Sequence, residues 1–237
     1  MKVGQMLAPV VLALDTSELE MAIDWVKATQ GLVAVYKLGL EFFLTCGSEG
    51  VRAIASETES EIFLDLKLHD IPHTVGGATR AIASLRPKYL TVHASGGSAM
   101  VAAAVEAVPS TFVTGVTILT SLTDGDVASI GFRSNALDSA VQLANVAVTG
   151  GARAIVCSPL EILAIRQSVG NEITIITPGV RPKSSVSTDD QMRTMTPREA
   201  IDRGADLVVI GRPITSLWSS GASAMRERTS EICAEIL

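Results

Sequence analysis

Eight short apolar segments, each followed by a stretch with helical periodicity, constrain the fold of this chain more than any other feature. They are typical of buried β-strands because they are rich in aliphatic residues. The predicted strands are Pro9–Asp15, Leu32–Leu38, Glu61–Leu68, Tyr89–His93, Phe112–Leu119, Ala154–Ser158, Ile173–Thr177 and Leu207–Gly211. The predicted helices are Glu18–Thr29, Gly47–Thr58, Val75–Leu85, Ala99–Val108, Ala136–Thr149, Pro159–Val169, Pro197–Arg203 and Ser220–Ile236. Eight βα units without a linker predict a single α/β domain over residues 1–237, a (β/α)8 TIM barrel.

A doubly wound open sheet is the alternative α/β architecture. It would carry a glycine-rich phosphate-binding turn after the first strand, but residues 13–18 contain no glycine. The hydrophobic fraction of 47% includes only 4% aromatic residues, and this suits the aliphatic strands of a parallel sheet covered by helices. The barrel therefore remains the predicted fold.

Charge and cysteine usage exclude several classes of function. The net charge of −6 argues against sequence-independent binding of nucleic acid, which requires a basic surface. Cys46, Cys157 and Cys233 form no CxxC pair, so neither a disulfide framework nor a zinc site is indicated. The chain shows no signal peptide and no apolar run of about 18 residues. We therefore expect a cytoplasmic protein that does not associate with membranes.

The segment 63–75 places charges in a strand that is otherwise apolar. Side chains alternate along a strand, so Asp65 and Lys67 share one face while the neighbouring leucines share the other. Charges on an enclosed face are costly unless they compensate one another, and Asp70 follows three residues after Lys67. A solvated edge strand is the alternative, but a closed parallel sheet has no wet edge. The segment therefore predicts a functional cluster.

Polar residues recur where the predicted strands end. Active sites of (β/α)8 barrels form at the carboxyl ends of the strands, so these side chains are expected to meet at one rim. They are Asp15, Lys37, Asp65, Lys67, His93, Thr120, Ser121, Thr177, Gly211 and Arg212. His93 is compatible both with a buried core histidine and with a ligand contact, since two glycines follow it closely.

The charges around Lys67 favour proton transfer over covalent catalysis. Lys37 and Lys67 alternate with carboxylates, which favour the charged form of each lysine. A charged lysine can donate a proton, whereas a Schiff-base lysine must be neutral. Asp65, Asp70 and His93 could form a divalent metal site, but the two lysines would repel a cation, so no metal is expected. A purely stabilising ion-pair network is the alternative interpretation.

The last two predicted strands indicate a phosphate site. In many barrels the loops after strands seven and eight bind phosphate through backbone N–H groups and a basic side chain. Here these loops contain Arg181 and the pair Gly211 and Arg212; the glycine permits close approach of the backbone and the arginine offers two parallel hydrogen bonds. The polar stretch Lys183–Arg193, which includes Gln191, is long enough for a mobile lid. A surface loop without a function is the alternative.

With these residues assembled, the chain resembles the bacterial-type orotidine 5′-monophosphate decarboxylases over nearly its whole length. The matching segments are Leu12–Asp15, Tyr36–Gly39, Phe63–Pro72, Val92–Gly97, Leu119–Ser121, Pro178–Pro182 and Ile210–Arg212. The DxKxxD pattern alone also occurs in related sugar-phosphate decarboxylases, but the full set in this order is specific. One departure is His73, where the family usually has asparagine.

The resemblance implies that the protein decarboxylates orotidine 5′-monophosphate to uridine 5′-monophosphate without a cofactor or metal. Lys67 would protonate C6 of the pyrimidine, and Asp65 and Asp70 would hold Lys67 and crowd the substrate carboxylate. The remaining implied contacts are Lys37 and Asp15 to the ribose, Thr120 and Ser121 to the pyrimidine, and Arg181, Gln191, Gly211 and Arg212 to the phosphate. Family members are homodimers, in which Asp70 and Thr74 would reach into the neighbouring subunit's site.

Two other functions remain open at the level of sequence. One is a magnesium-dependent sugar-phosphate decarboxylase or epimerase on the same barrel, which a chelator would inactivate. The other is a nucleotide-binding barrel without catalytic activity, although the presence of Asp65, Lys67 and Asp70 together argues against it.

Overall fold

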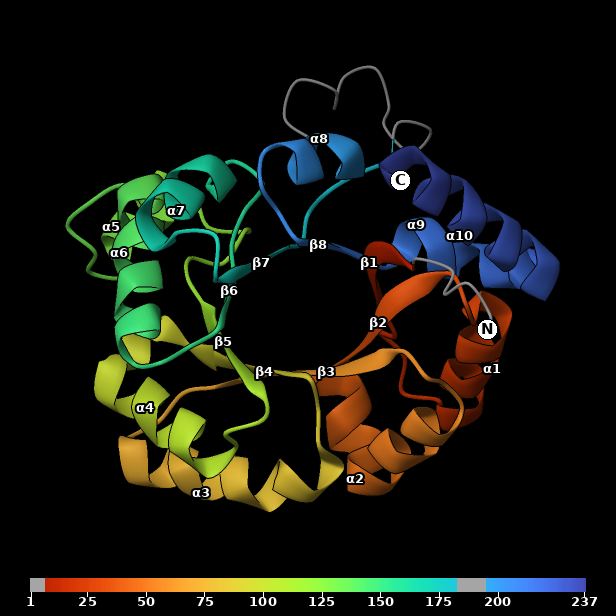
Figure 1. The fold of residues 1–237 in the computed structure, drawn as a ribbon, viewed down its shortest axis with the longest axis horizontal. Helices are drawn as coiled ribbons and strands as arrows, with labels where there is room; N and C mark the ends of the chain where they lie inside the picture. Colours follow the sequence, from red (N-terminus) through yellow and green to blue (C-terminus); the bar gives the residue numbers. More distant parts are fainter. Residues whose placement is uncertain (1–6, 183–194) are drawn as a thin grey trace.

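The protein folds into a closed barrel of eight parallel strands surrounded by helices (Figure 1). The computed structural model describes residues 7–182 and 195–237. The strands are β1 Ala8–Ala13, β2 Val33–Gly39, β3 Glu61–Leu68, β4 Tyr89–His93, β5 Phe112–Val116, β6 Ala154–Val156, β7 Thr174–Thr177 and β8 Leu207–Ile210. Each strand pairs with the next in the chain, and β1 closes the ring against β8. The predicted (β/α)8 architecture is confirmed.

Helices surround the barrel, and most of them pack on its outside (Figure 1). They are α1 Leu19–Thr29, α2 Leu40–Ser56, α3 Pro72–Ile82, α4 Ser98–Ala107, α5 Asp124–Ser129, α6 Ala136–Thr149, α7 Ile162–Val169, α8 Pro197–Asp202, α9 Arg212–Thr215 and α10 Ala222–Ile236. Short 3₁₀ helices occupy Ala83–Leu85, Ala94–Gly96 and Ser216–Ser220. The strands carry aliphatic side chains on both faces of the sheet, one facing the helices and the other facing the inside of the barrel. These side chains therefore form two separate apolar cores.

The two cores follow from the alternation of side chains along each strand. One core fills the inside of the barrel with Val11, Val35, Phe63, Tyr89, Ala154, Ile176 and Leu207. Phe63, Tyr89 and Phe112 add edge-to-face ring contacts, with centroids 5.6 and 5.7 Å apart. The larger core lies between the strands and the helices. The inner core fills the barrel, so a ligand is confined to one of its ends.

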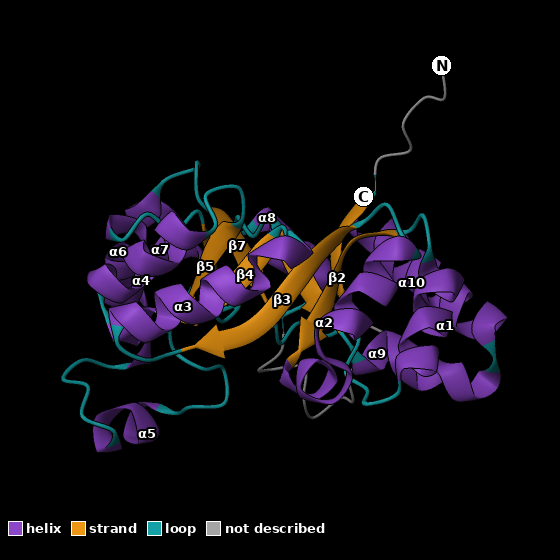
Figure 2. Ribbon diagram, turned by 90° about the horizontal axis from the view of Figure 1, so that it is seen from below, coloured by secondary structure: helices purple, strands orange, loops and turns teal. Residues whose placement is uncertain are grey.

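Several predicted boundaries are wrong. The helix expected to begin at Gly47 begins at Leu40 and continues through a non-helical Gly47 (φ 59°). The fifth strand ends at Val116 rather than Leu119, and the chain then enters a loop that leads to α5, which was not predicted. Helix α5 stands away from the barrel, at the end toward which β3 points (Figure 2). The apolar residues Ile118 and Leu119 resemble a strand in sequence but line cavities at this end.

Candidate active site

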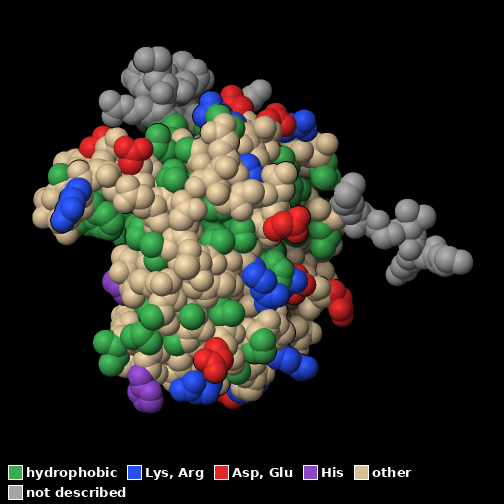
Figure 3. Space-filling model, turned by 60° about the vertical axis from the view of Figure 1, so that its left-hand side comes forward, with side chains coloured by type: hydrophobic (Ala, Val, Ile, Leu, Met, Phe, Trp, Pro, Cys, Tyr) green, Lys and Arg blue, Asp and Glu red, His purple; other side chains and the backbone are tan. Residues whose placement is uncertain are grey.

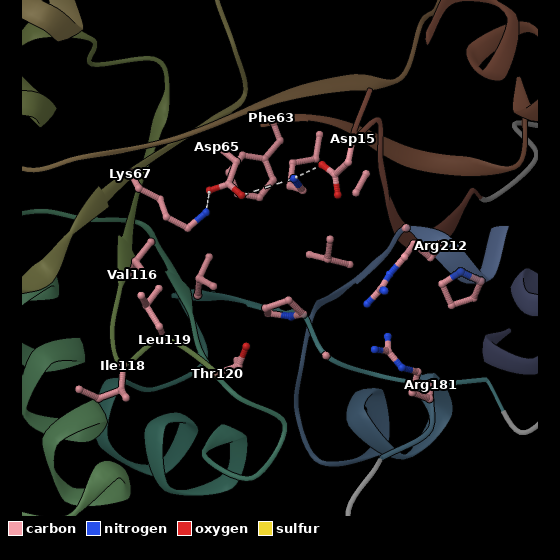
Figure 4. Close-up of a pocket in the computed structure, with 18 residues that line it drawn as sticks. Asp15, Phe63, Asp65, Lys67, Val116, Ile118, Leu119, Thr120, Arg181 and Arg212 are labelled. Atoms are coloured by element: carbon pink, nitrogen blue, oxygen red, sulfur yellow. Dashed lines mark hydrogen bonds and ion pairs between the residues drawn. The ribbon is translucent and has the colours of Figure 1, made fainter. Parts of the chain in front are cut away.

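A cavity of about 330 Å³ opens at the carboxyl ends of the strands. Its lining comes from the first three strands, from β5, β6 and β8, and from the segments that follow β1, β5, β7 and β8 (Figure 4). The lining residues are Ala13, Asp15, Lys37, Phe63, Asp65, Lys67, Val116, Ile118, Leu119, Thr120, Val156, Pro178, Gly179, Arg181, Val209, Gly211, Arg212 and Pro213. The cavity therefore lies above the inner core, where the fold predicts a site.

Four charged side chains of alternating sign form a row along one wall. Lys37 Nζ lies 3.1 Å from Asp15 Oδ1 and 3.5 Å from Asp65 Oδ2. Lys67 Nζ lies 2.8 Å from Asp65 Oδ1. Strands β1, β2 and β3 are adjacent, so residues separated by up to 52 positions in sequence meet here. The row leaves each ammonium group within reach of the cavity.

Asp65 is the centre of this row, and its side chain is only 13% exposed. Burial alone would raise the pKa of its carboxyl group, but the ammonium groups of Lys37 and Lys67 outweigh burial, together with hydrogen bonds from Lys67 and Thr91. The pKa of Asp65 is therefore lower than its ordinary value. Together with Asp15, this ionised carboxylate balances the charges of the two lysines.

Gly39, at the end of β2, provides space for the charged row. A Cβ atom at this position would lie 3.2 Å from Lys37 Nζ and 3.4 Å from Asp15 Oδ1. The first contact is tight, so Lys37 Nζ would have to move by a few tenths of an ångström. The small residue at the end of the segment Tyr36–Gly39 therefore leaves room for the ion pair between Lys37 and Asp15.

The opposite end of the cavity carries two arginines. Arg181 follows β7 and Arg212 follows β8, and both side chains point into the cavity (Figure 4). The backbone N–H of Arg181 donates to the carbonyl of Met195 at 3.0 Å, which fixes the chain on both sides of the segment between them. With Lys37 and Lys67, the lining contains four cationic and two anionic side chains, although the chain has a net charge of −6. The cavity is therefore suited to an anion.

The segment after β5 forms the apolar wall between the two charged ends. Ile118, Leu119 and Thr120 line the cavity, while Ser121 is exposed on the same loop. The loop is tied to β6 because Thr117 donates from both its backbone N–H and its hydroxyl to the carbonyl of Val156, at 3.2 and 3.0 Å. This wall could contact the flat face of an aromatic ligand.

Besides Ser121, two predicted site residues lie outside the cavity of their own chain. Asp70 is exposed, and its Oδ1 accepts a hydrogen bond from the N–H of Ile71 at 2.7 Å. Thr74 is exposed in the first turn of α3. Lys67 is therefore paired with Asp65 within this chain, and the alternating row ends at Lys67. A third predicted residue, Gln191, and the expected lid 183–193 fall outside the described residues.

None of the three histidines lines the cavity. His93 ends β4, and its ring centroid lies 5.4 Å from that of His69. Burial, His69 and Lys67 lower the pKa of His93, against an opposing effect of Asp65, so the ring is neutral near pH 7. His73, the departure from the family pattern, is exposed in α3.

Three further observations concern metal ligands, membrane-spanning helices and surface charge. Within residues 7–182 and 195–237, no three His, Cys, Asp or Glu side chains are grouped so as to hold a metal ion. No helix in the same part of the chain is long and apolar enough to cross a membrane. On the face shown in Figure 3, basic side chains are interspersed with acidic ones rather than gathered into one patch.

Sequence reasoning missed two buried residues beside the cavity. Thr91 in β4 is fully buried, and its hydroxyl lies 3.0 Å from Asp65 Oδ1. Glu161 is 5% exposed and precedes α7. Thr91 falls on the inward face of a predicted strand, so alternation could have identified it. In the sequence, Glu161 resembles the acidic residues that are common at the N-termini of helices. Its burial depends on tertiary packing and could not be read from the sequence.

Comparison with known proteins extends these observations. Residues 8–224 match the family described as "Orotidine 5'-phosphate decarboxylase / HUMPS family". The chain is 49% identical over 219 residues to the orotidine 5'-phosphate decarboxylase of Thermobifida fusca, covering 92% of this chain and 94% of that one. It is 45% identical over 234 residues to the Frankia casuarinae protein of the same name, covering 92% of this chain and 85% of the other.

Solved structures show the same similarity. The orotidine 5'-phosphate decarboxylase of Lactobacillus acidophilus superposes with a TM-score of 0.80 at 30% identity, covering 97% of this chain and 99% of the other. The Pyrococcus horikoshii protein of the same name gives a TM-score of 0.77 at 26% identity, covering 96% and 98%. The barrel fold is thus shared with these structures along almost the whole chain.

Proposed function

The chain belongs to the orotidine 5'-phosphate decarboxylase / HUMPS family, and from this premise we propose that it converts orotidine 5′-monophosphate to uridine 5′-monophosphate and CO2. This reaction is the last step of de novo pyrimidine synthesis, and we place it in the cytoplasm. The observation that carries the proposal is the cavity, which has the row of alternating lysines and aspartates at one end, two arginines at the other and an apolar wall between them. A substrate with a carboxylate near one end, a phosphate at the other and an aromatic ring between them matches this distribution.

Lys67 is the proposed catalytic acid. When the bond between C6 and the carboxylate breaks, CO2 leaves and an electron pair stays at C6, where no conjugated group can accept it. The ammonium group of Lys67 stabilises this developing charge and transfers a proton to C6. The lysine then recovers a proton from water. This role suits a side chain that is 30% exposed and bonded to a buried carboxylate.

Asp65 holds the acid and acts on the substrate carboxylate. Its Oδ1 and Oδ2 face Lys67 and Lys37, respectively, so both ammonium groups are fixed before substrate binds. A negative charge at this position also repels the carboxylate that is lost, which is a ground-state contribution. Lys37 and Asp15 are assigned to the ribose hydroxyls, because they are adjacent in the row and lie between the catalytic lysine and the arginine end.

The arginine end is assigned to the phosphate. Arg181, Gly211 and Arg212 line it, and guanidinium groups bind phosphate through paired, charge-assisted hydrogen bonds. Gln191 is proposed to join them. Binding energy from a phosphate that does not react can lower the barrier at C6, provided that it is realised in the transition state. Thr120 and Ser121 are assigned to the pyrimidine because they belong to the loop between the two ends.

The active unit is proposed to be a homodimer with shared sites. Asp70 lies outside the cavity of its own chain, and the row of charges ends at Lys67, where a further carboxylate would continue the alternation. Asp70 of the partner subunit would provide that carboxylate, with Thr74 of the partner subunit beside it. A two-fold axis makes these contacts reciprocal, so each dimer has two complete sites.

The test is a decarboxylation assay that follows the loss of orotidylate absorbance, with and without EDTA. We expect turnover that EDTA does not change, and Lys67→Ala should abolish turnover while binding of uridine 5′-monophosphate remains measurable. Inactivation by EDTA would favour a magnesium-dependent sugar-phosphate enzyme. Binding of the product without turnover by the wild-type protein would indicate a non-catalytic barrel, and near-normal turnover by Lys67→Ala would refute the assignment of the acid.

A further inference from the structure

The backbone of Lys67 is held in a conformation that residues other than glycine seldom adopt. Its φ angle is 48°, in the left-handed region. The pairing of β3 with β4 is irregular at the same place, since Leu64 pairs with Leu90 but Leu68 pairs with Val92. Three residues of β3 therefore stand opposite a single residue of β4, which is Thr91. Such bulges redirect side chains and are frequent next to active sites.

The hydroxyl group of Thr91 forms hydrogen bonds with two polar groups of this bulge. Thr91 is fully buried. Its Oγ1 accepts a hydrogen bond from the backbone N–H of Lys67 at 2.8 Å and donates one to Asp65 Oδ1 at 3.0 Å. A hydroxyl has one hydrogen to donate and lone pairs to accept, and both capacities are used here. One buried atom therefore links the backbone of the lysine to the carboxylate that pairs with its ammonium group.

The same bond sets the rotation of the Asp65 carboxylate. The terminal torsion of an aspartate has a broad energy profile, so neighbouring groups decide it. Asp65 Oδ1 accepts from both Thr91 and Lys67 Nζ, at 3.0 and 2.8 Å. This leaves Oδ2 facing Lys37 at 3.5 Å. In Figure 4, Asp65 and Lys67 accordingly point toward one another at the wall of the cavity.

We propose that Thr91 is a positioning residue for the reaction: its hydroxyl fixes both the left-handed backbone of Lys67 and the orientation of the Asp65 carboxylate. This inference rests on the proposed function, in which Lys67 delivers a proton to C6. Thr91 belongs to β4, and its effect reaches the substrate through Asp65 and Lys67. Misplacement of a catalytic group by about 1 Å can cost about 100-fold in rate, so loss of this hydroxyl should reduce kcat.

The test compares Thr91→Val, Thr91→Ser and Thr114→Val with the wild-type protein. Valine has the shape of threonine without its hydroxyl, and serine keeps the hydroxyl. Thr114 is the matched control: it is fully buried, lies in β5 directly opposite Thr91 of β4, and donates a hydrogen bond from its hydroxyl to the carbonyl of Phe112 at 2.9 Å. We expect Thr91→Val to lower kcat by about 100-fold with little change in KM. Thr91→Ser and Thr114→Val should stay close to the wild type.

A folded Thr91→Val enzyme with kcat close to that of the wild type would overturn the proposal, as would equal losses in Thr91→Val and Thr114→Val. If Thr91→Val does not unfold cooperatively, Thr91→Cys is compared with Thr91→Ser, since a thiol is a weaker hydrogen-bonding group of similar size. Equal kcat in that pair would also overturn it.

Crystal structures separate this inference from the proposed function. If the wild-type protein does not decarboxylate the substrate, the proposed function fails, and the structures still decide what Thr91 does. We expect φ of Lys67 to stay positive in the wild type and in Thr91→Ser, and to leave the left-handed region in Thr91→Val. An unchanged Lys67 and Asp65 in crystals of Thr91→Val would refute the positioning role.

Discussion

The burial of Glu161 leads to a prediction about the pH dependence of stability, and this prediction does not depend on the identity of the substrate. The residue is 5% exposed, and burial raises the pKa of its carboxyl group to about 7, although the backbone N–H of Ser158 donates to Oε2 at 2.9 Å. The residue lines a second cavity behind the loop that follows β5, together with Thr120. The perturbation is Glu161→Gln, which removes the charge and keeps an oxygen that can accept from Ser158.

The magnitude follows from the difference between the folded and unfolded states. The ordinary pKa of the group is 4.5 and the folded value is about 7, so between these limits the folded protein keeps a proton that the unfolded chain releases. The free energy of unfolding therefore falls as pH rises, by about 1.4 kcal/mol for each pH unit. Over this window the ionisation of Glu161 lowers the free energy of unfolding of the wild-type protein by about 3 kcal/mol. A glutamine at this position does not titrate and makes no such contribution.

The assay is urea unfolding of both proteins between about pH 4 and pH 8, at a single protein concentration. The wild type should lose about 3 kcal/mol relative to Glu161→Gln as pH rises through the window, because the other titrating groups are common to both. Glu172→Gln, at an exposed glutamate, is the control and should follow the wild type. Parallel pH profiles for the wild type and Glu161→Gln would refute the reasoning.

Three further predictions concern the active site. Arg212→Ala should lower kcat/KM for orotidine 5′-monophosphate by roughly 3 kcal/mol, about 100-fold, yet barely affect the slow reaction of orotidine; equal losses would place Arg212 elsewhere. Asp65→Asn removes the carboxylate that pairs with Lys67 and leaves Lys37 with Asp15 alone, so urea unfolding should show a loss of about 3 kcal/mol, and no loss would contradict the ion-pair geometry. Lys67→Ala and Asp70→Ala homodimers should both be nearly inactive, but an equal mixture that is unfolded and refolded together should regain activity in about a quarter of all sites. Heterodimers that form and stay inactive would show that Asp70 serves its own subunit.

The sequence by itself determined the barrel and the rim on which the site lies. Aliphatic strands alternating with helical segments permit few other folds, and strand ends converge at one rim whatever the details of packing. For this reason Asp15, Lys37, Asp65 and Arg212 could be brought together from their positions in the chain, and all four line the cavity. Strand alternation also placed Lys67 on the correct face.

Only the tertiary structure decided how these residues are held. Alternation assumes a regular strand, but Lys67 reaches the cavity from a left-handed backbone in a bulge whose N–H is satisfied by Thr91, 24 residues away. The direction in which Asp70 points and the burial of Glu161 likewise depend on what packs around them. Local sequence sets propensity and periodicity, whereas register shifts, buried hydrogen bonds and desolvation arise from contacts between distant segments. Those contacts exist only once the barrel has closed.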